Sequence, residues 1–320
     1  MKRREFICGI SCFIAALGFG AAVPKFSGNF INKTTDDDII ERMELGGFTV
    51  AASSHCNLNC KGCDTYSPLS KEEFVTYEQF SRDMDKLKEL APDRQMGLAF
   101  LGGEPLLNPE LAKLVQKTKE LYPDNDITIL TNGILLNQMT DEFWKTIKKC
   151  NVNLCLTKYP VNIDRKNYMA KAQKYGVDVG YDIVASDNLY DLNTKEIIKP
   201  EKQEGFPWSK NILDLKGKQD YIEKRKSCPH RGIVQYARGN IYYCYVHAFI
   251  NSFIDYFKVN IPITKDDYIK IADVKDIKEI DDFLSKPKPL CRYCKQCHNI
   301  CYGGEPLEWG FSKREISEWT

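Results

Sequence analysis

The chain has 320 residues, of which 43% are hydrophobic, and its 45 basic residues nearly balance its 44 acidic residues. That length and apolar content suffice for one large or two ordinary domains with a hydrophobic core. Because the formal net charge is only +1, the composition gives no electrostatic reason to expect a nucleic acid or an acidic polymer as a partner.

Residues 1–26 predict an export signal or a membrane anchor. Arg3 and Arg4 precede an apolar run over residues 6–23. The small residues at 20–22, near the end of this run, offer a cleavage site, so the segment has the shape of a signal peptide. The order Arg3-Arg4-x-Phe6 resembles a twin-arginine signal, which implies export of a folded, cofactor-loaded protein to the periplasm. If uncleaved, the run is about the ~17–25 residues that span a bilayer and would associate with the membrane. The alternative is a cytoplasmic protein in which the arginine pair is incidental.

Strand and helix patterns alternate from residue 45 to residue 190. Apolar runs and capping residues predict strands at 48–52, 97–101, 127–130, 152–157 and 177–184, and helices at 76–90, 109–121, 140–149 and 166–175. This alternation favours a parallel sheet with right-handed crossovers. Five or six such units are too few for a closed eight-fold barrel, so we predict an α/β fold, a partial (β/α)6 TIM-like barrel.

Three cysteines follow the first predicted strand in a C-x3-C-x2-C pattern, at Cys56, Cys60 and Cys63. A [4Fe–4S] cluster needs four ligands, so three thiolates leave one iron open to an outside group. A structural zinc ion would require a fourth ligand nearby, and His55 is awkwardly placed for that because it adjoins Cys56. The spacing therefore favours a cluster with an open iron over zinc.

Two further motifs lie at the ends of the next strands. Gly102-Gly103-Glu104-Pro105 follows the second strand and Thr131-Asn132-Gly133 follows the third. Either could be an ordinary turn, but in this order the three motifs resemble the radical S-adenosylmethionine (SAM) superfamily. The resemblance implies that the first cysteines bind a [4Fe–4S] cluster, that the other two motifs bind SAM, and that Glu104 orients it. One departure is Gly62, because relatives usually carry an aromatic residue before the third cysteine.

A second cysteine group lies between residues 228 and 301. Cys291, Cys294, Cys297 and Cys301 have a ferredoxin-type spacing. Together with Gly239, the pair Cys228 and Cys244 resembles the first half of the SPASM extension of radical SAM enzymes, within the SPASM/twitch group. Six thiolates cannot supply eight ligands, so we predict one auxiliary iron–sulfur cluster, or two with one incompletely ligated. Zinc is the alternative for these C-x2-C pairs.

These patterns divide the chain into the signal, a radical SAM core over 45–190, a polar linker over 191–227 and a small C-terminal auxiliary-cluster domain over 228–320. Cys150 and Cys155 flank a buried strand and are predicted to pack in the core.

The resemblance implies an enzyme that cleaves SAM reductively to a 5′-deoxyadenosyl radical, for hydrogen abstraction from a peptide, a saccharide or another small molecule. It also implies an electron donor such as a flavodoxin or ferredoxin. The alternative is an iron–sulfur electron-transfer or binding protein that keeps the fold without the chemistry. No residue is assigned as a proton-transferring acid or base.

Overall fold

The structure is a computed structural model that describes residues 43–320 apart from 206–207, 209–210, 229, 231 and 298–307. For Asn211, Gln296 and Cys297 it describes the backbone alone. The predicted signal or anchor over residues 1–26, together with Cys8 and Cys12, lies outside the described residues. Cys301 also lies outside them.

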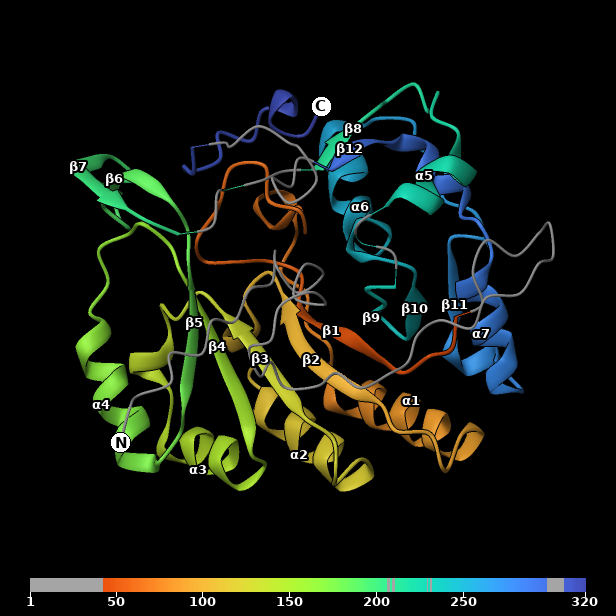
Figure 1. Cartoon of the computed structure of the whole chain (residues 1–320), viewed down its shortest axis with the longest axis horizontal. Helices are drawn as coiled ribbons and strands as arrows, with labels where there is room; N and C mark the ends of the chain where they lie inside the picture. Colours follow the sequence, from red (N-terminus) through yellow and green to blue (C-terminus); the bar gives the residue numbers. More distant parts are fainter. Residues whose placement is uncertain (1–42, 206–207, 209–210, 229, 231, 298–307) are drawn as a thin grey trace.

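The core is an eight-stranded sheet with the order β11-β10-β9-β1-β2-β3-β4-β5 (Figure 1). Its first five strands are β1 (Gly47–Ser53), β2 (Gly97–Gly102), β3 (Ile127–Thr131), β4 (Val152–Lys158) and β5 (Val179–Ile183). All neighbours among these five strands pair in parallel. The predicted α/β class with a mostly parallel central sheet is confirmed. The sheet does not close, because β5 and β11 are its two edges.

Four helices connect these strands and cover one face of the sheet (Figure 1). They are α1 (Tyr77–Leu90), α2 (Leu111–Leu121), α3 (Asp141–Lys149) and α4 (Arg165–Tyr175). The side chains of Thr76, Thr140 and Asp164 accept hydrogen bonds from the first turns of α1, α3 and α4, which supplies acceptors to otherwise unpaired backbone N–H groups. These caps set where each helix begins. Because β1 to β5 pair in parallel, their carboxyl ends all open on the same edge of the sheet.

The chain after β5 is more regular than a linker. It forms a hairpin from β6 (Ser186–Tyr190), at the end of the predicted core, and β7 (Ile197–Gln203), within the segment predicted as a polar linker. The remaining elements are β8 (Asn211–Leu213), α5 (Tyr221–Ser227), β9 (Gln235–Ala237), β10 (Asn240–Tyr242), α6 (Tyr245–Phe257), β11 (Tyr268–Lys270), α7 (Ile277–Ser285) and β12 (Cys294–Cys297).

The sixth parallel strand comes from the C-terminal region. β9 pairs in parallel with β1, through Thr49 opposite Gln235 and Val50 opposite Tyr236, and it therefore lies beside β1 instead of beside β5. β10 and β11 then add in antiparallel orientation. The segment between Cys228 and Cys291 thus contributes strands to the same sheet as β1, which leads into the first cysteine loop.

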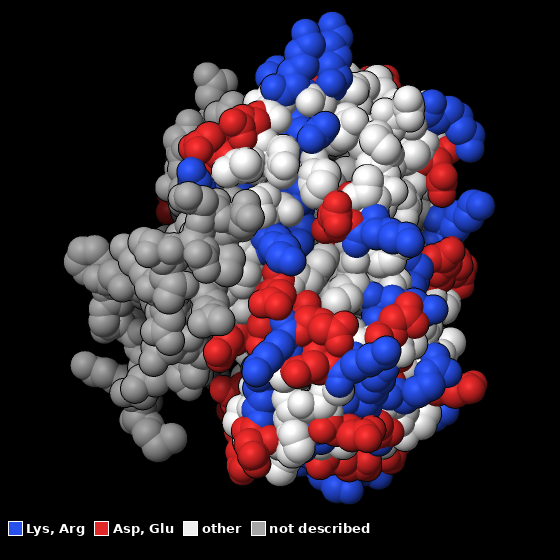
Figure 2. All heavy atoms as spheres, turned by 90° about the vertical axis from the view of Figure 1, so that its right-hand side faces the viewer, with Lys and Arg blue, Asp and Glu red and all other residues white. Residues whose placement is uncertain are grey.

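The surface agrees with the balanced composition. On the face shown in Figure 2, lysine and arginine side chains interleave with aspartate and glutamate, so no broad field of one sign is present there. In the part of the chain that the structure describes, we find no helix with both the length and the apolar character needed to cross a membrane.

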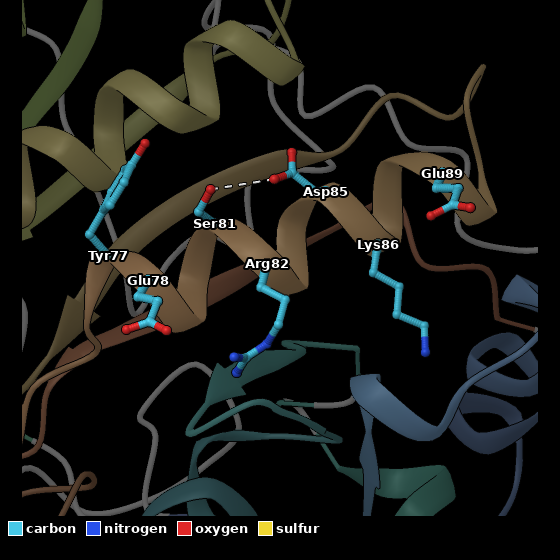
Figure 3. A pocket seen from close by; sticks show the side chains of 7 residues that line it. All are labelled: Tyr77, Glu78, Ser81, Arg82, Asp85, Lys86 and Glu89. Atoms are coloured by element: carbon cyan, nitrogen blue, oxygen red, sulfur yellow. Dashed lines mark hydrogen bonds between the residues drawn. The ribbon is translucent and has the colours of Figure 1, made fainter.

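A hollow of about 700 Å³ lies along α1, lined by Tyr77, Glu78, Ser81, Arg82, Asp85, Lys86 and Glu89 (Figure 3). These side chains project from successive turns of one helix and include both signs of charge. Two of the lining residues have partners elsewhere, because Asp85 pairs with Lys117 at 2.6 Å and Lys86 donates to the carbonyl of Ala272 at 2.5 Å. None of the predicted site residues lines this hollow, and we assign it no role.

Candidate active site and auxiliary cysteine site

The first cysteine loop leaves the carboxyl end of β1 and is shaped by left-handed residues. Asn59 has φ +63° and Gly62 has φ +63°, a region that side chains with a Cβ rarely adopt. Glycine at position 62 therefore fits the backbone that this loop takes. The loop ends where the N–H of Tyr66 donates to the carbonyl of Cys63 at 3.0 Å.

The three thiols of this loop lie within electrostatic reach of one another. Cys60 is buried, and burial raises the pKa of its thiol well above the ordinary value, with the charges of Cys63 and Cys56 adding to the increase. Burial likewise raises the pKa of Cys56, to which Glu104 and Cys63 contribute, and that of Cys63. Thiols with such raised pKa values stay protonated until a cation replaces their protons, as metal ligation does.

The glycines after β2 permit a close approach between two backbones. A Cβ on Gly102 would lie 2.1 Å from the carbonyl oxygen of Ser53, and a Cβ on Gly103 would lie 1.9 Å from that of His55. The N–H of Gly103 donates to Ser53 at 2.8 Å and that of Glu104 donates to His55 at 2.9 Å. The Gly-Gly pair therefore fastens the end of β2 to the start of the cysteine loop.

Replacing Gly103 with alanine should disrupt this junction. Because the new Cβ would overlap backbone atoms of His55, which cannot move aside as a flexible side chain can, we expect a loss of about 2–4 kcal/mol of unfolding free energy. Chemical denaturation measures it. The matched control is Gly310→Ala, because a Cβ at Gly310 meets nothing within 4 Å. Equal midpoints for the two variants would contradict the steric role.

Glu104 is the buried centre of the two SAM-type motifs. Its Oε1 accepts hydrogen bonds from Thr131 Oγ1 at 2.6 Å and from the Leu106 N–H at 3.0 Å, and its Oε2 accepts one from the Asn132 N–H at 2.9 Å. Burial raises the pKa of Glu104 to about 7, against the effect of these three hydrogen bonds. The carboxylate thus holds the loop after β2 to the loop after β3.

Asn132 connects this pair of loops with the cysteines. Its Nδ2 donates to Asn57 Oδ1 at 2.8 Å and lies 3.5 Å from Cys56 Sγ. Its Oδ1 accepts from the Ile134 N–H at 2.9 Å, which fixes the orientation of the amide. The structure therefore brings all three predicted motifs together at the carboxyl ends of β1, β2 and β3, the edge at which parallel α/β sheets bind ligands.

The C-terminal segment packs against the cysteine loop, which the sequence did not predict. Cys60 forms an antiparallel bridge with Phe311, and the Lys61 N–H donates to the Gly310 carbonyl at 2.8 Å. Trp319 Nε1 donates to the carbonyl of Cys63 at 2.9 Å. We call residues 308–320 the C-terminal strap. No local pattern could reveal these contacts, because they join positions about 250 residues apart.

Trp309, in the strap, provides a test of whether the loop suits a cluster. Its side chain is fully buried and packs with Cys60 and Leu58. Its indole N–H lies close enough to Cys60 to lower the pKa of that thiol. The same indole N–H nevertheless forms no hydrogen bond in the structure. A buried donor without an acceptor is costly, and a thiolate or sulfide at this position would supply one. The donor set and its surroundings therefore fit an iron–sulfur cluster.

The second cysteine group also converges, at the ends of several elements. Cys228 is the C-cap residue of α5 and Cys244 is the N-cap residue of α6, while Cys291 precedes β12 and Cys294 begins it. Burial and then the charge of Cys228 raise the pKa values of Cys244 and Cys291, so these three thiols are neighbours. Of the two remaining predicted ligands, the Cys297 side chain and the whole of Cys301 lie outside the described residues.

Tyr66 places Cys294 in the same neighbourhood. Its side chain is fully buried, and its hydroxyl has no hydrogen-bond partner. Burial raises its pKa, and the charges of Cys294, Cys244 and Cys63 act in the same direction. Tyr66 therefore lies between the first and second cysteine groups. Its unsatisfied hydroxyl is the kind of donor that a sulfur of a bound cluster would satisfy.

Among the described residues, neither cysteine group has the geometry of a metal site. Among the residues that the structure describes, no three His, Cys, Asp or Glu side chains already have an arrangement that would hold a metal ion. Cys150 and Cys155, predicted to pack in the core, are both buried. Cys150 is the C-cap residue of α3 and belongs to the main hydrophobic cluster. Cys155 lies within β4 and is disulfide-bonded, so it is not a free core cysteine as predicted.

Comparison with known proteins agrees with this geometry. Residues 50–165 match the radical SAM superfamily, and this range contains the first cysteine loop and both SAM-type motifs. Residues 50–165 of the chain are thus similar to the radical SAM superfamily. It is 36% identical over 108 residues to the GTP 3′,8-cyclase of Clostridium acetobutylicum, covering 33% of each chain. It is 27% identical over 148 residues to that of Staphylococcus epidermidis, covering 42% of this chain and 43% of the relative.

The chain therefore spans about a third to two fifths of the length of these enzymes. Among solved structures, it resembles BtrN in complex with AdoMet and 2-DOIA, with 18% identity, a TM-score of 0.46 and coverage of 79% of this chain and 95% of BtrN. Native anSMEcpe with bound AdoMet matches at 20% identity with a TM-score of 0.32, covering 44% of each chain.

Proposed function

We propose that this protein is a radical SAM enzyme that binds a [4Fe–4S] cluster through Cys56, Cys60 and Cys63. The observation that carries the proposal is the convergence of this loop with Glu104 and Asn132, which belong to separate strand ends. Such a cluster with SAM bound beside it would supply a 5′-deoxyadenosyl radical for hydrogen abstraction from a substrate.

The protein's own part is to ligate, orient and exclude water. The three thiolates hold the cluster and leave one iron open for SAM. Gly102, Gly103, Glu104 and Pro105, with Thr131, Asn132 and Gly133, form the adjoining wall of the site. Buried Trp309 packs against Tyr159 and Tyr190, with ring centroids 5.7 and 5.3 Å apart, and together they keep water from the Cys60 side of the loop.

The proposal includes one auxiliary iron–sulfur cluster, held by Cys228, Cys244, Cys291 and Cys294. Its support is the shared neighbourhood of these thiols and the unsatisfied hydroxyl of Tyr66 beside them. Four thiolates complete a [4Fe–4S] cluster without Cys297 or Cys301. This favours one auxiliary cluster, of the SPASM/twitch kind, over two.

The substrate that we propose is a small molecule, a saccharide or a peptide, with a flavodoxin or ferredoxin as electron donor. The twin-arginine-like start supports a further proposal of export to the periplasm or membrane anchoring. Immunoblots of fractionated cells test it, because mature protein in the periplasm or membrane supports export and full-length protein in the cytosol contradicts it.

A second function has one observation in its favour. Glu104 already accepts three hydrogen bonds from the protein, so its carboxylate is satisfied without the amino group of SAM. In an iron–sulfur electron-transfer protein that has kept this fold, Glu104 would serve only to hold the loops after β2 and β3 together.

Anaerobic reconstitution and reduction with SAM should distinguish the two functions. We expect the wild-type chain to form 5′-deoxyadenosine, and Cys56→Ala to abolish its formation while lowering iron per chain by about half. Cys294→Ala should remove the other half and keep SAM cleavage. Cys150→Ala is the control, because Cys150 lies between α3 and the start of β4, whereas the first cysteine loop follows the carboxyl end of β1. A full iron complement in the wild type without 5′-deoxyadenosine would favour the electron-transfer protein.

A further inference from the structure

A basic residue lies three positions from each of three auxiliary cysteines, and all three are buried. Arg225 precedes Cys228 on α5, Lys288 precedes Cys291, and His247 follows Cys244 on α6. Arg225 is 0% exposed, Lys288 1% and His247 2%. Fully buried arginine and lysine are rare, because taking a cation out of water is expensive unless an anion compensates it.

Lys288 is held mainly by uncharged groups. Its ammonium donates to the carbonyl of Phe283 and lies 3.7 Å from the centroid of the Phe283 ring. Within the described residues Lys288 forms no ion pair at 4.0 Å or less. Burial, followed by repulsion from Arg225, lowers the pKa of Lys288 to about 8. The fold therefore keeps an ammonium in a place that disfavours it.

Arg225 is fixed beside the same cysteines. Its Nη2 donates to the Leu284 carbonyl at 2.7 Å and contacts Met43 Sδ at 3.1 Å. Its guanidinium lies 3.9 Å from the centroid of the Tyr243 ring. The charges of Arg225 and Lys288 both act on Cys291 and on His247, so the two cations face one shared volume.

The nearby carboxylate, Asp267, already serves other donors. Its Oδ1 accepts from the Leu290 N–H at 2.9 Å, and its Oδ2 accepts from the N–H and hydroxyl of Thr264, both at 2.9 Å. The charges of Asp267 and Asp266 both act on Lys288, as does that of Arg225. Two buried cations thus lie in the neighbourhood of the auxiliary cysteines, where they would meet the negative charge of a bound cluster.

We propose that Arg225 and Lys288 form a buried cationic pair that compensates the charge of the auxiliary cluster and raises its reduction potential. The inference rests on the proposed auxiliary cluster. A cluster held by four thiolates is an anion, and one-electron reduction adds one more negative charge without a proton. Nearby fixed positive charge stabilises that reduced form, and net charge is one of the factors that set iron–sulfur potentials.

The test is a redox titration of the auxiliary cluster, followed by electron paramagnetic resonance. It uses the full chain with Cys56, Cys60 and Cys63 replaced by alanine, so that the remaining signal comes from the second site. In this background we expect Lys288→Met to lower the equilibrium constant for reduction about tenfold, which is about 59 mV for a one-electron couple. Lys288→Arg should restore the parent potential, because it keeps the charge.

Two further variants make the result specific. Lys286→Met makes the same chemical change two residues away at an exposed position, where water screens the charge, and should leave the potential unchanged. Arg225→Lys keeps the second cation and should do the same. Because Lys288→Met also removes the hydrogen bond to the Phe283 carbonyl, chemical denaturation of each variant accompanies the redox titration.

The outcomes separate the two proposals. Iron in the parent and a lower potential in Lys288→Met alone support the cationic pair. Iron in every variant with one common potential overturns the pair and leaves the auxiliary cluster standing. A parent that takes up no iron overturns the auxiliary cluster and the pair with it.

Discussion

Replacing Glu104 with glutamine is expected to lower the unfolding free energy by about 1–3 kcal/mol and to weaken SAM binding at least tenfold. In the structure both carboxylate oxygens of Glu104 accept hydrogen bonds, from Thr131, Asn132 and Leu106. An amide must direct its own NH2 group at one of these donors, so a buried N–H or O–H loses its acceptor. The loops after β2 and β3 then separate. Thermal unfolding and isothermal titration with SAM measure the two effects.

The control for this prediction is another buried glutamate. Glu318, in the C-terminal strap, accepts from Ser312 Oγ at 2.6 Å and from the Lys313 N–H at 2.7 Å. Glu318→Gln should lose comparable stability without a tenfold loss of SAM affinity, because it touches neither SAM-type motif. If Glu104→Gln unfolds early but binds SAM as tightly as the wild type, Glu104 is a structural link between loops and not part of the SAM site.

Local sequence patterns predicted the parallel core well. The strands and helices from β1 to β5 lie within a few residues of their predicted ranges, because buried strands read as apolar runs and the helices begin at recognisable caps. The three motifs were expected at strand ends and are found there. The Gly-Gly pair was assigned to SAM binding through the resemblance alone. The structure adds the steric contact with β1 that requires it.

Features that depend on distant pairing escaped prediction. β9 has only three residues, and its place beside β1 joins positions nearly 190 residues apart, so no periodicity could indicate it. β7 falls in the predicted polar linker, because it is mostly exposed and contains Pro200 and so lacks the alternation that marks a half-buried strand. The cationic pair was missed because sequence alone does not show that Arg225 and Lys288 are buried.

Replacing Trp309 with alanine is expected to cost about 3–5 kcal/mol of unfolding free energy and to speed loss of the first cluster in air. Trp309 is fully buried beside Cys60, and its ring packs on Phe311, with centroids 5.1 Å apart. Its removal leaves a cavity between the strap and the cysteine loop through which water and oxygen can reach the cluster. Chemical denaturation gives the first quantity, and the decay of cluster absorbance on air exposure gives the second.

The phenylalanine variants separate packing from hydrogen bonding. Trp309→Phe keeps an aromatic ring and should retain stability to within about 1–2 kcal/mol, but it removes the N–H that faces Cys60. Because hydrogen bonds to cluster sulfur raise the reduction potential, the first cluster should become harder to reduce. Trp319→Phe is the control, since that indole donates to the Cys63 carbonyl oxygen and its loss should leave the potential unchanged. Identical potentials in Trp309→Phe and the wild type would mean that the strap shields the cluster without tuning it.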